Sequence, residues 1–128
     1  MANNPENLKY TKDHEWASID ESNIVTVGIT DFAQSSLGDI VFVELPEIGD
    51  NLEEGSSFGV VESIKSVSDL YAPVSGEVVE RNEDVLEQPE VINSDAYSSW
   101  MLKIKVEDIS VMDKLLTNTD YEDFCANS

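Results

Sequence analysis

Apolar and polar residues follow the two-residue period of β-strands along most of the chain. In residues 100–106 every second side chain is apolar, and Met101 shares the other face with two lysines, as in a strand with one buried face. Other short runs rich in Val, Ile and Phe end at Gly, Pro, Asn or Asp. The predicted strands are residues 14–19, 24–29, 40–45, 58–64, 67–74, 77–81 and 100–106. This pattern predicts a mainly β fold of antiparallel strands.

Helical signals are confined to short segments. Three pairs of residues have the three-residue spacing of a capping box, which marks the start of a helix. The pairs are Asp31–Gln34, Ser110–Asp113 and Thr119–Glu122. We expect Gly38 to end the first helix in the left-handed conformation, residues 82–84 to form a turn and residues 86–93 an irregular connection. The last two pairs predict two C-terminal helices within residues 108–125, which would cover an open end of the sheets.

These elements predict one domain over residues 1–128, because a chain of this length can build one core. The expected architecture is a flattened barrel-sandwich of antiparallel strands with small helices packed on it. Residues 1–7 are polar, and we expect them to be flexible.

The chain is strongly acidic. Asp and Glu number 27 against 7 Lys and Arg, which gives a net charge of −20. Such a surface repels nucleic acid and anionic membranes, so neither is expected as a partner. The charge is expected to keep the protein monomeric and to steer it toward basic patches on larger enzymes. Composition fits equally well a charge that serves solubility alone.

Cysteine usage and hydropathy bear on the compartment. Cys125 is the only cysteine, so no internal disulfide can form and a reducing compartment is expected. No apolar run has the length of a membrane span, and residues 1–6 lack a basic leader pattern. A cytoplasmic protein of bacterial type is the simplest interpretation.

Lys65 is the candidate site residue. It lies in residues 63–66, a connection between two predicted strands that is too short for a helix and long enough for a hairpin turn. It is the only cation between Lys12 and Arg81. A solubilising turn lysine is the commonplace interpretation. A modification site is the other, because an exposed ε-amine on a rigid turn can accept an amide-linked group.

Catalytic signatures are missing from the sequence, which has no GxSxG, phosphate loop, HExxH or Cys/His cluster. His14 is the only histidine. Without cysteine or histidine partners it cannot build a metal site, so we expect a structural role for it. The protein is therefore expected to be non-catalytic.

Several ordered segments carry a resemblance to a known family. They are HEW at 14–16, VGIT at 27–30, DFAQ followed by LGDIVFVELPEIG within 31–49, GVVESIKSVSD at 59–69, APVSGEVVERN at 72–82 and WMLKIKV at 100–106. On these segments the chain resembles the lipoyl and biotinyl carrier domains, and most closely the H-protein family of glycine cleavage systems. The resemblance spans about residues 8–125.

The resemblance implies a lipoyl-domain-like barrel-sandwich hybrid, with lipoic acid joined by an amide to Lys65 in the 57–79 hairpin. A lipoate ligase or a lipoyl or octanoyl transferase would attach the group. The attachment turn would be completed by four neighbours, Glu62, Ser63, Ile64 and Ser66.

The resemblance also implies a carrier function. The arm would take the aminomethyl group of glycine from a pyridoxal-phosphate glycine decarboxylase (P protein) to a tetrahydrofolate-dependent aminomethyltransferase (T protein). A flavin-dependent dihydrolipoamide dehydrogenase (L protein) would reoxidise it. By position, Glu15 and Asp69 are expected to line a groove for the loaded arm; the alternative is that both are ordinary surface acids.

The sequence disfavours one alternative function and leaves another open. A biotinyl carrier would normally set its lysine between methionines, whereas Ile64 and Ser66 flank Lys65 here. A lipoyl-relay protein, which hands its lipoyl group to other acceptors, needs the same lysine on the same fold and therefore fits the sequence as well.

Overall fold

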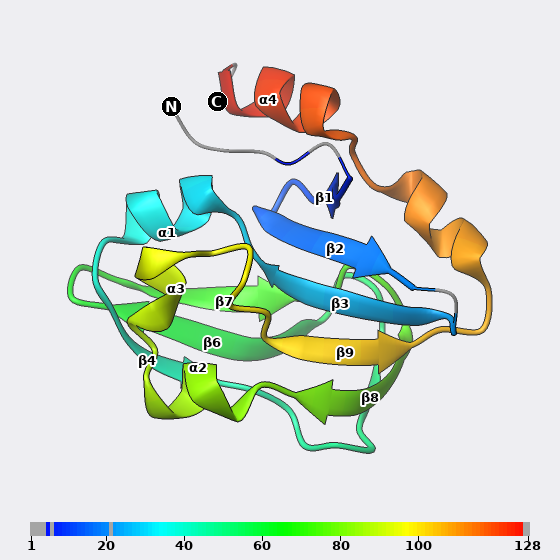
Figure 1. Cartoon of the computed structure of the whole chain (residues 1–128), viewed down its shortest axis with the longest axis horizontal. Helices are drawn as coiled ribbons and strands as arrows, with labels where there is room; N and C mark the ends of the chain where they lie inside the picture. The colour runs from blue at the N-terminus through cyan, green and yellow to red at the C-terminus, as the bar shows by residue number, and fades with distance from the viewer. Residues whose placement is uncertain (1–4, 6, 21, 127–128) are drawn as a thin grey trace.

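The computed structural model describes residues 5, 7–20 and 22–126. Most of the segment 1–7, expected to be flexible, lies outside the described residues. The described strands form two antiparallel sheets (Figure 1). In the six-stranded sheet the order is β1 (Lys9–Tyr10), β2 (Glu15–Ile19), β3 (Ile24–Ile29), β9 (Leu102–Lys105), β8 (Gly76–Arg81) and β5 (Asn51–Leu52). In the three-stranded sheet it is β4 (Ile40–Glu44), β6 (Ser57–Ser63) and β7 (Val67–Tyr71).

One hydrophobic core joins the two sheets. Val25 and Val27 of β3 are buried in the same cluster as Val43 of β4 and Val61 of β6. Alternation along each strand places these residues on the inner faces, and burying those faces holds the sheets together. The mainly β class with antiparallel sheets is confirmed, and the sheets do not close into a barrel.

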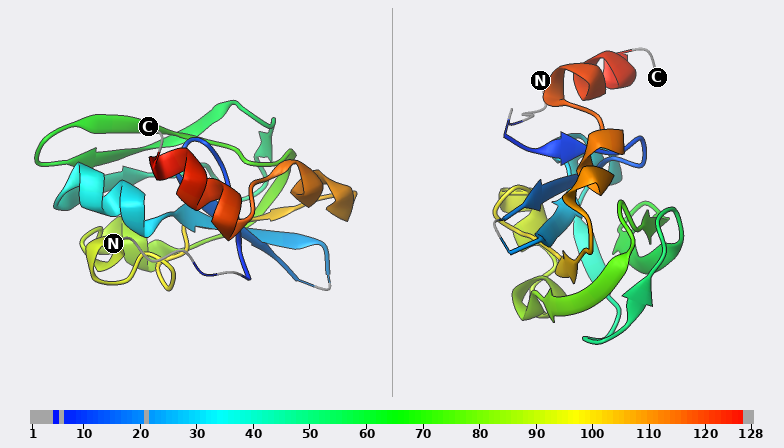
Figure 2. Two further views of the ribbon diagram at one scale, coloured as in Figure 1. Left: turned by 90° about the horizontal axis from the view of Figure 1, so that it is seen from above. Right: turned by 90° about the vertical axis from the view of Figure 1, so that its right-hand side faces the viewer.

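The expected helices are present, together with two that were not predicted. They are α1 (Asp31–Leu37), α2 (Glu83–Glu87), α3 (Val91–Ser94), the 3-10 helix η1 (Ile109–Lys114) and α4 (Asn118–Ala126). Figure 2 shows α4 lying over β1. The segment before α4 pairs through Leu116 with Tyr10 at the sheet edge, so the C-terminal pair hides an edge as expected.

The predicted helix starts are displaced by one or two residues. Thr30 caps α1, because its Oγ1 accepts a hydrogen bond from the N–H of Ala33 at 3.2 Å. Asp108 rather than Ser110 caps η1. Thr117 accepts from the N–H of Asp120 at the start of α4. A capping oxygen must stand just before the helix, and several Ser, Thr and Asp residues compete for that place.

The segment from residue 82 to 93 was wrongly predicted as a turn and an irregular connection. Asn82 caps α2, whose Val85 is buried, and α3 buries Ile92. These helices are too short to show a helical period.

Met101 was predicted to lie on the polar face of the last strand, but its side chain is fully buried. It precedes β9, and its N–H donates to the carbonyl of Val27 at 2.7 Å.

Candidate functional site

Lys65 lies at the tip of the β6–β7 hairpin, where the sequence placed it. The antiparallel ladder continues up to the pair Glu62 and Val67, and the side chain of Lys65 is exposed. Ser63 shapes the turn: its Oγ accepts from the backbone N–H groups of Lys65 and Ser66, both at 3.1 Å. These bonds fix the backbone on both sides of the lysine.

The lysine side chain lies against Gly38, just after α1. Gly38 has φ 81°, a conformation that favours glycine. A Cβ at this position would lie 3.1 Å from Cε of Lys65. Asn93 holds the segment in place, because its Nδ2 donates to the carbonyl of Gly38 at 2.8 Å and its Oδ1 accepts from the N–H of Ile40 at 2.9 Å. Gly38 therefore leaves room for the stem of Lys65.

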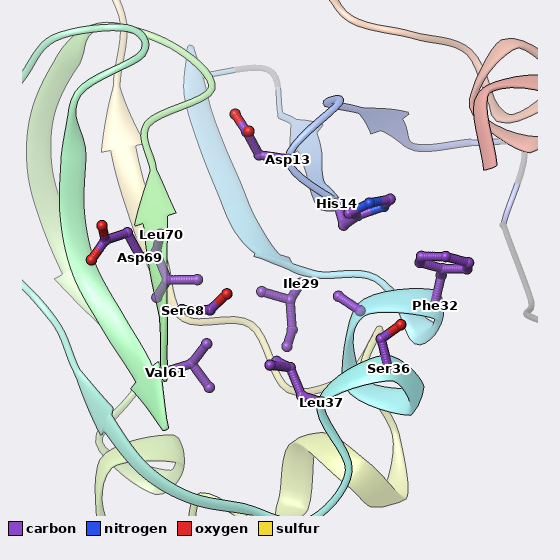
Figure 3. A pocket seen from close by; sticks show the side chains of 11 residues that line it. Asp13, His14, Ile29, Phe32, Ser36, Leu37, Val61, Ser68, Asp69 and Leu70 are labelled. Carbon is purple, nitrogen blue, oxygen red and sulfur yellow. The ribbon is translucent and has the colours of Figure 1, made fainter. Parts of the chain in front are cut away.

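A pocket of about 160 Å³ opens between α1, β7 and the start of β2 (Figure 3). Its wall is mainly apolar, as is usual for sites that receive an apolar group. The apolar lining residues are Ile29, Phe32, Ala33, Leu37, Val61 and Leu70, and the polar ones are Asp13, His14, Ser36, Ser68 and Asp69. Because α1 runs from this wall to Gly38, the pocket lies along the helix that Lys65 meets at its end.

Asp69 borders the pocket, but its carboxylate lies on the other side of β7 from Ser68 (Figure 3). Alternation along the strand requires this, since adjacent side chains point to opposite faces. Asp13 is a second acid at the pocket that the sequence analysis missed. It precedes β2 in a loop, and no local pattern distinguishes it from other surface acids.

Glu15 was predicted for the same groove, and the structure corrects this placement. Its side chain is 1% exposed and is not among the pocket-lining residues. Oε2 accepts a hydrogen bond from the N–H of Tyr71 at 2.7 Å. Oε1 is buried and has no hydrogen-bond partner within the described residues. Burial raises the pKa of Glu15 to about 8.

His14 is tied to the C-terminal helix. It has φ 66°, and its Nδ1 lies 2.7 Å from the hydroxyl of Tyr121. The same hydroxyl lies 2.8 Å from Oγ1 of Thr30, the cap of α1. The ring also stacks on Phe32, and burial lowers the pKa of His14. These contacts give His14 the structural role predicted for it and make Tyr121 a link between two walls of the pocket.

Comparison with known proteins places this geometry in a family. The sequence model of the glycine cleavage H-protein matches residues 8–128. The chain belongs to the glycine cleavage H-protein family. Members of the H-protein family are the lipoyl carriers of glycine cleavage systems, so the predicted function is confirmed at that level.

Individual relatives agree. The chain is 56% identical over 119 residues to the glycine cleavage system H protein of Carboxydothermus hydrogenoformans, covering 92% of this chain and 91% of the relative. It is 53% identical over 120 residues to that of Staphylococcus haemolyticus, covering 93% and 94%. The crystal structure of the H protein from Mycobacterium marinum has a TM-score of 0.88 and 40% identity, with 95% and 98% covered.

Two properties of the described residues bear on other functions. They contain no group of three or more His, Cys, Asp or Glu side chains arranged to hold a metal ion. None of their helices is long and apolar enough to cross a membrane.

Proposed function

We propose that Lys65 carries the lipoyl group of a glycine cleavage system through an amide on Nζ. The observation that carries the proposal is the position of this lysine, exposed on a hydrogen-bonded turn with its stem over Gly38 at the end of α1. Glu62, Ser63, Ile64 and Ser66 form the attachment turn. When bound, the dithiolane supplies the sulfur chemistry that receives and releases an aminomethyl group and is then reoxidised.

The pocket beside α1 is the resting place for the arm. Its apolar wall suits a hydrocarbon chain and a dithiolane, because moving apolar surface out of water stabilises the docked position. Asp13 borders the opening, where its charge favours a cationic cargo over a neutral one. Docking on the same molecule occurs at high effective concentration, so weak contacts suffice.

The chain itself is a non-catalytic carrier. Its partners are the glycine decarboxylase, the aminomethyltransferase and the dihydrolipoamide dehydrogenase, together with a lipoate ligase or a lipoyl or octanoyl transferase that loads Lys65. A monomeric, cytoplasmic protein suits this carrier function, since one lipoyl arm must visit several enzymes in turn. Membership of the H-protein family favours a lipoyl group over biotin.

The test is intact-mass spectrometry after incubation with a lipoate ligase, lipoate and ATP. Lys65→Arg keeps the charge and should gain no lipoyl mass, while the wild type should gain one group. Lys103→Arg is the matched control, because Lys103 is held near Trp100 and Glu80 and should not be acylated. One group on wild type that persists in Lys65→Arg would refute the assignment.

A further inference from the structure

The outer face of the three-stranded sheet carries an apolar surface beside Lys65. We propose that this surface docks the enzyme that forms the amide on Lys65, which goes beyond the proposed function and rests on it. We call it the tip patch and define it as Val41, Phe42, Ile64 and Val67.

Exposure distinguishes the tip patch from the rest of the surface. Its side chains are exposed by 56% (Val41), 45% (Phe42), 68% (Ile64) and 63% (Val67). In the part of the chain that the structure describes, only Ile48 is another large apolar residue with such exposure. The protein has a net charge of −20, which favours solubility, whereas a group of exposed apolar side chains opposes it. Such a group indicates a surface that a partner covers.

Strand register gathers the patch on one face. Phe42 of β4 and Val67 of β7 are both cross-strand partners of Glu62 in the middle strand, so the half-buried Glu62 lies between them on the same face. The β4–β6 register shifts between Ile40 and Phe42. This bulge turns two consecutive residues, Val41 and Phe42, outward where alternation would bury one of them.

Ile64 extends the patch to the tip of the hairpin. Its N–H donates to the carbonyl of Asp39 at 3.0 Å, and its neighbour Ser63 pairs with Ile40. Ile64 therefore lies beside the start of β4 and directly before Lys65. In both panels of Figure 2 the three-stranded sheet lies at the periphery, with the described helices on its other side.

The attaching enzyme is the partner that this position fits. A lysine amine stays within one side-chain length of its backbone, so an enzyme that acylates it must close over the neighbouring residues of the hairpin. Enzymes that act at the far end of an acyl arm can work at a distance from the tip. Asp39, Glu44 and Asp69 are exposed around the patch. The partner should therefore present an apolar groove with a basic rim.

The bonds changed in this reaction involve only Nζ of the protein. Nζ attacks the carbonyl carbon of an acyl adenylate or acyl thioester, a C–N amide bond forms, the bond to the adenylate or thiol breaks, and the amine loses a proton. The tip patch touches none of these atoms. It should therefore contribute to docking and leave the chemical step unchanged.

The experiment compares acylation kinetics by intact mass, with a lipoate ligase, lipoate and ATP. The double variant Phe42→Thr/Val67→Thr keeps residues suited to strands and adds no charge. Its kcat/KM should fall by about tenfold or more, through KM, because buried anchors dominate docking. Ile48→Thr removes an equally exposed apolar side chain, 61% exposed, outside the patch. It should change kcat/KM by less than about twofold.

Three outcomes would overturn the inference. The first is an unchanged kcat/KM in the double variant, and the second is a loss confined to kcat, with the urea unfolding midpoint showing that the variant is folded. The third is slower reduction of the fully lipoylated double variant by dihydrolipoamide dehydrogenase while ligation is normal, which would assign the patch to that enzyme. A wild-type protein that gains no lipoyl group on Lys65 would instead refute the proposed function, and this inference with it.

Discussion

Glu15 connects the two sheets through a single buried carboxyl group. It belongs to β2 in the six-stranded sheet, and its Oε2 accepts from the N–H of Tyr71 at the end of β7 in the other. With Oε1 unpartnered within the described residues, the ionised form lacks solvation. Burial therefore raises its pKa to about 8, and the group is mostly neutral at pH 7.

This shift predicts a pH dependence of stability. The folded chain holds the Glu15 proton up to about pH 8, whereas the unfolded chain releases it above about pH 4.5. Between these values the folded state binds more protons, so the free energy of unfolding falls as pH rises. Glu15→Gln cannot ionise and should lose this slope. Across the whole interval the wild type should lose at most about 5 kcal/mol relative to the variant, at about 1.4 kcal/mol per pKa unit.

Urea denaturation over about pH 5 to about pH 8 measures the effect. Asp69→Asn makes the same chemical change at an exposed position and should leave the wild-type slope in place. Parallel pH curves for wild type and Glu15→Gln would show that the buried carboxyl is solvated in solution and that the pKa is not raised.

Single residues differ in how far the sequence reveals them. Lys65 could be located because a hairpin is built from neighbouring residues. Glu15 could not be told apart from Asp69, because its burial depends on a contact with a strand 56 residues away. The position of Asp13 at the pocket and that of Gly38 against Lys65 likewise depend on the fold, which brings α1, β2 and the hairpin together.

Among the elements, strands were predicted best. Their alternation records which side chains meet the core, so the two long hairpins appear near their expected bounds. Short helices depend more on tertiary packing than on local pattern. Two helices, α2 and α3, have five and four residues, and they exist because Val85 and Ile92 fill the core.

The helix α4 stabilises the pocket from a distance through Tyr121. Its hydroxyl is the only group that bonds both His14 and Thr30 in the described structure, and its ring stacks on Tyr10 of β1 at 4.8 Å between centroids. The C-terminal helix is thus hydrogen-bonded through Tyr121 to both the loop before β2 and the start of α1.

Tyr121→Phe should keep the stacking and remove both hydrogen bonds. The free energy of unfolding should fall by about 1–3 kcal/mol, because buried polar groups on His14 and Thr30 lose a partner. The His14 ring resonances should shift in NMR spectra. Tyr71→Phe is the control, because that half-buried tyrosine has no hydroxyl hydrogen bond in the described structure. Removing its hydroxyl group should lower the free energy of unfolding by less than about 0.5 kcal/mol. Equal effects in both variants would contradict the link.

For the whole molecule, the excess of negative charge has two opposite consequences. With a net charge of −20, like charges repel one another in the folded state and lower its stability. The same field attracts partners that carry basic patches. Acids near the candidate site, such as Asp39, Glu44 and Asp69, are exposed to such partners. Both effects act over the electrostatic screening length, which added salt shortens. Salt should therefore raise the stability of the protein and weaken its attraction to partners, so the two consequences can be measured separately.

Raising sodium chloride from about 10 mM to about 150 mM shortens the screening length from about 30 Å to about 8 Å. The free energy of unfolding should rise as self-repulsion is screened, and the KM of dihydrolipoamide dehydrogenase for the lipoylated protein should rise as attraction is lost. Urea denaturation and steady-state reduction measure the two changes, and potassium chloride controls for specific ion effects. If stability rises while KM stays constant, the charge contributes to solubility and the partners bind through uncharged contacts.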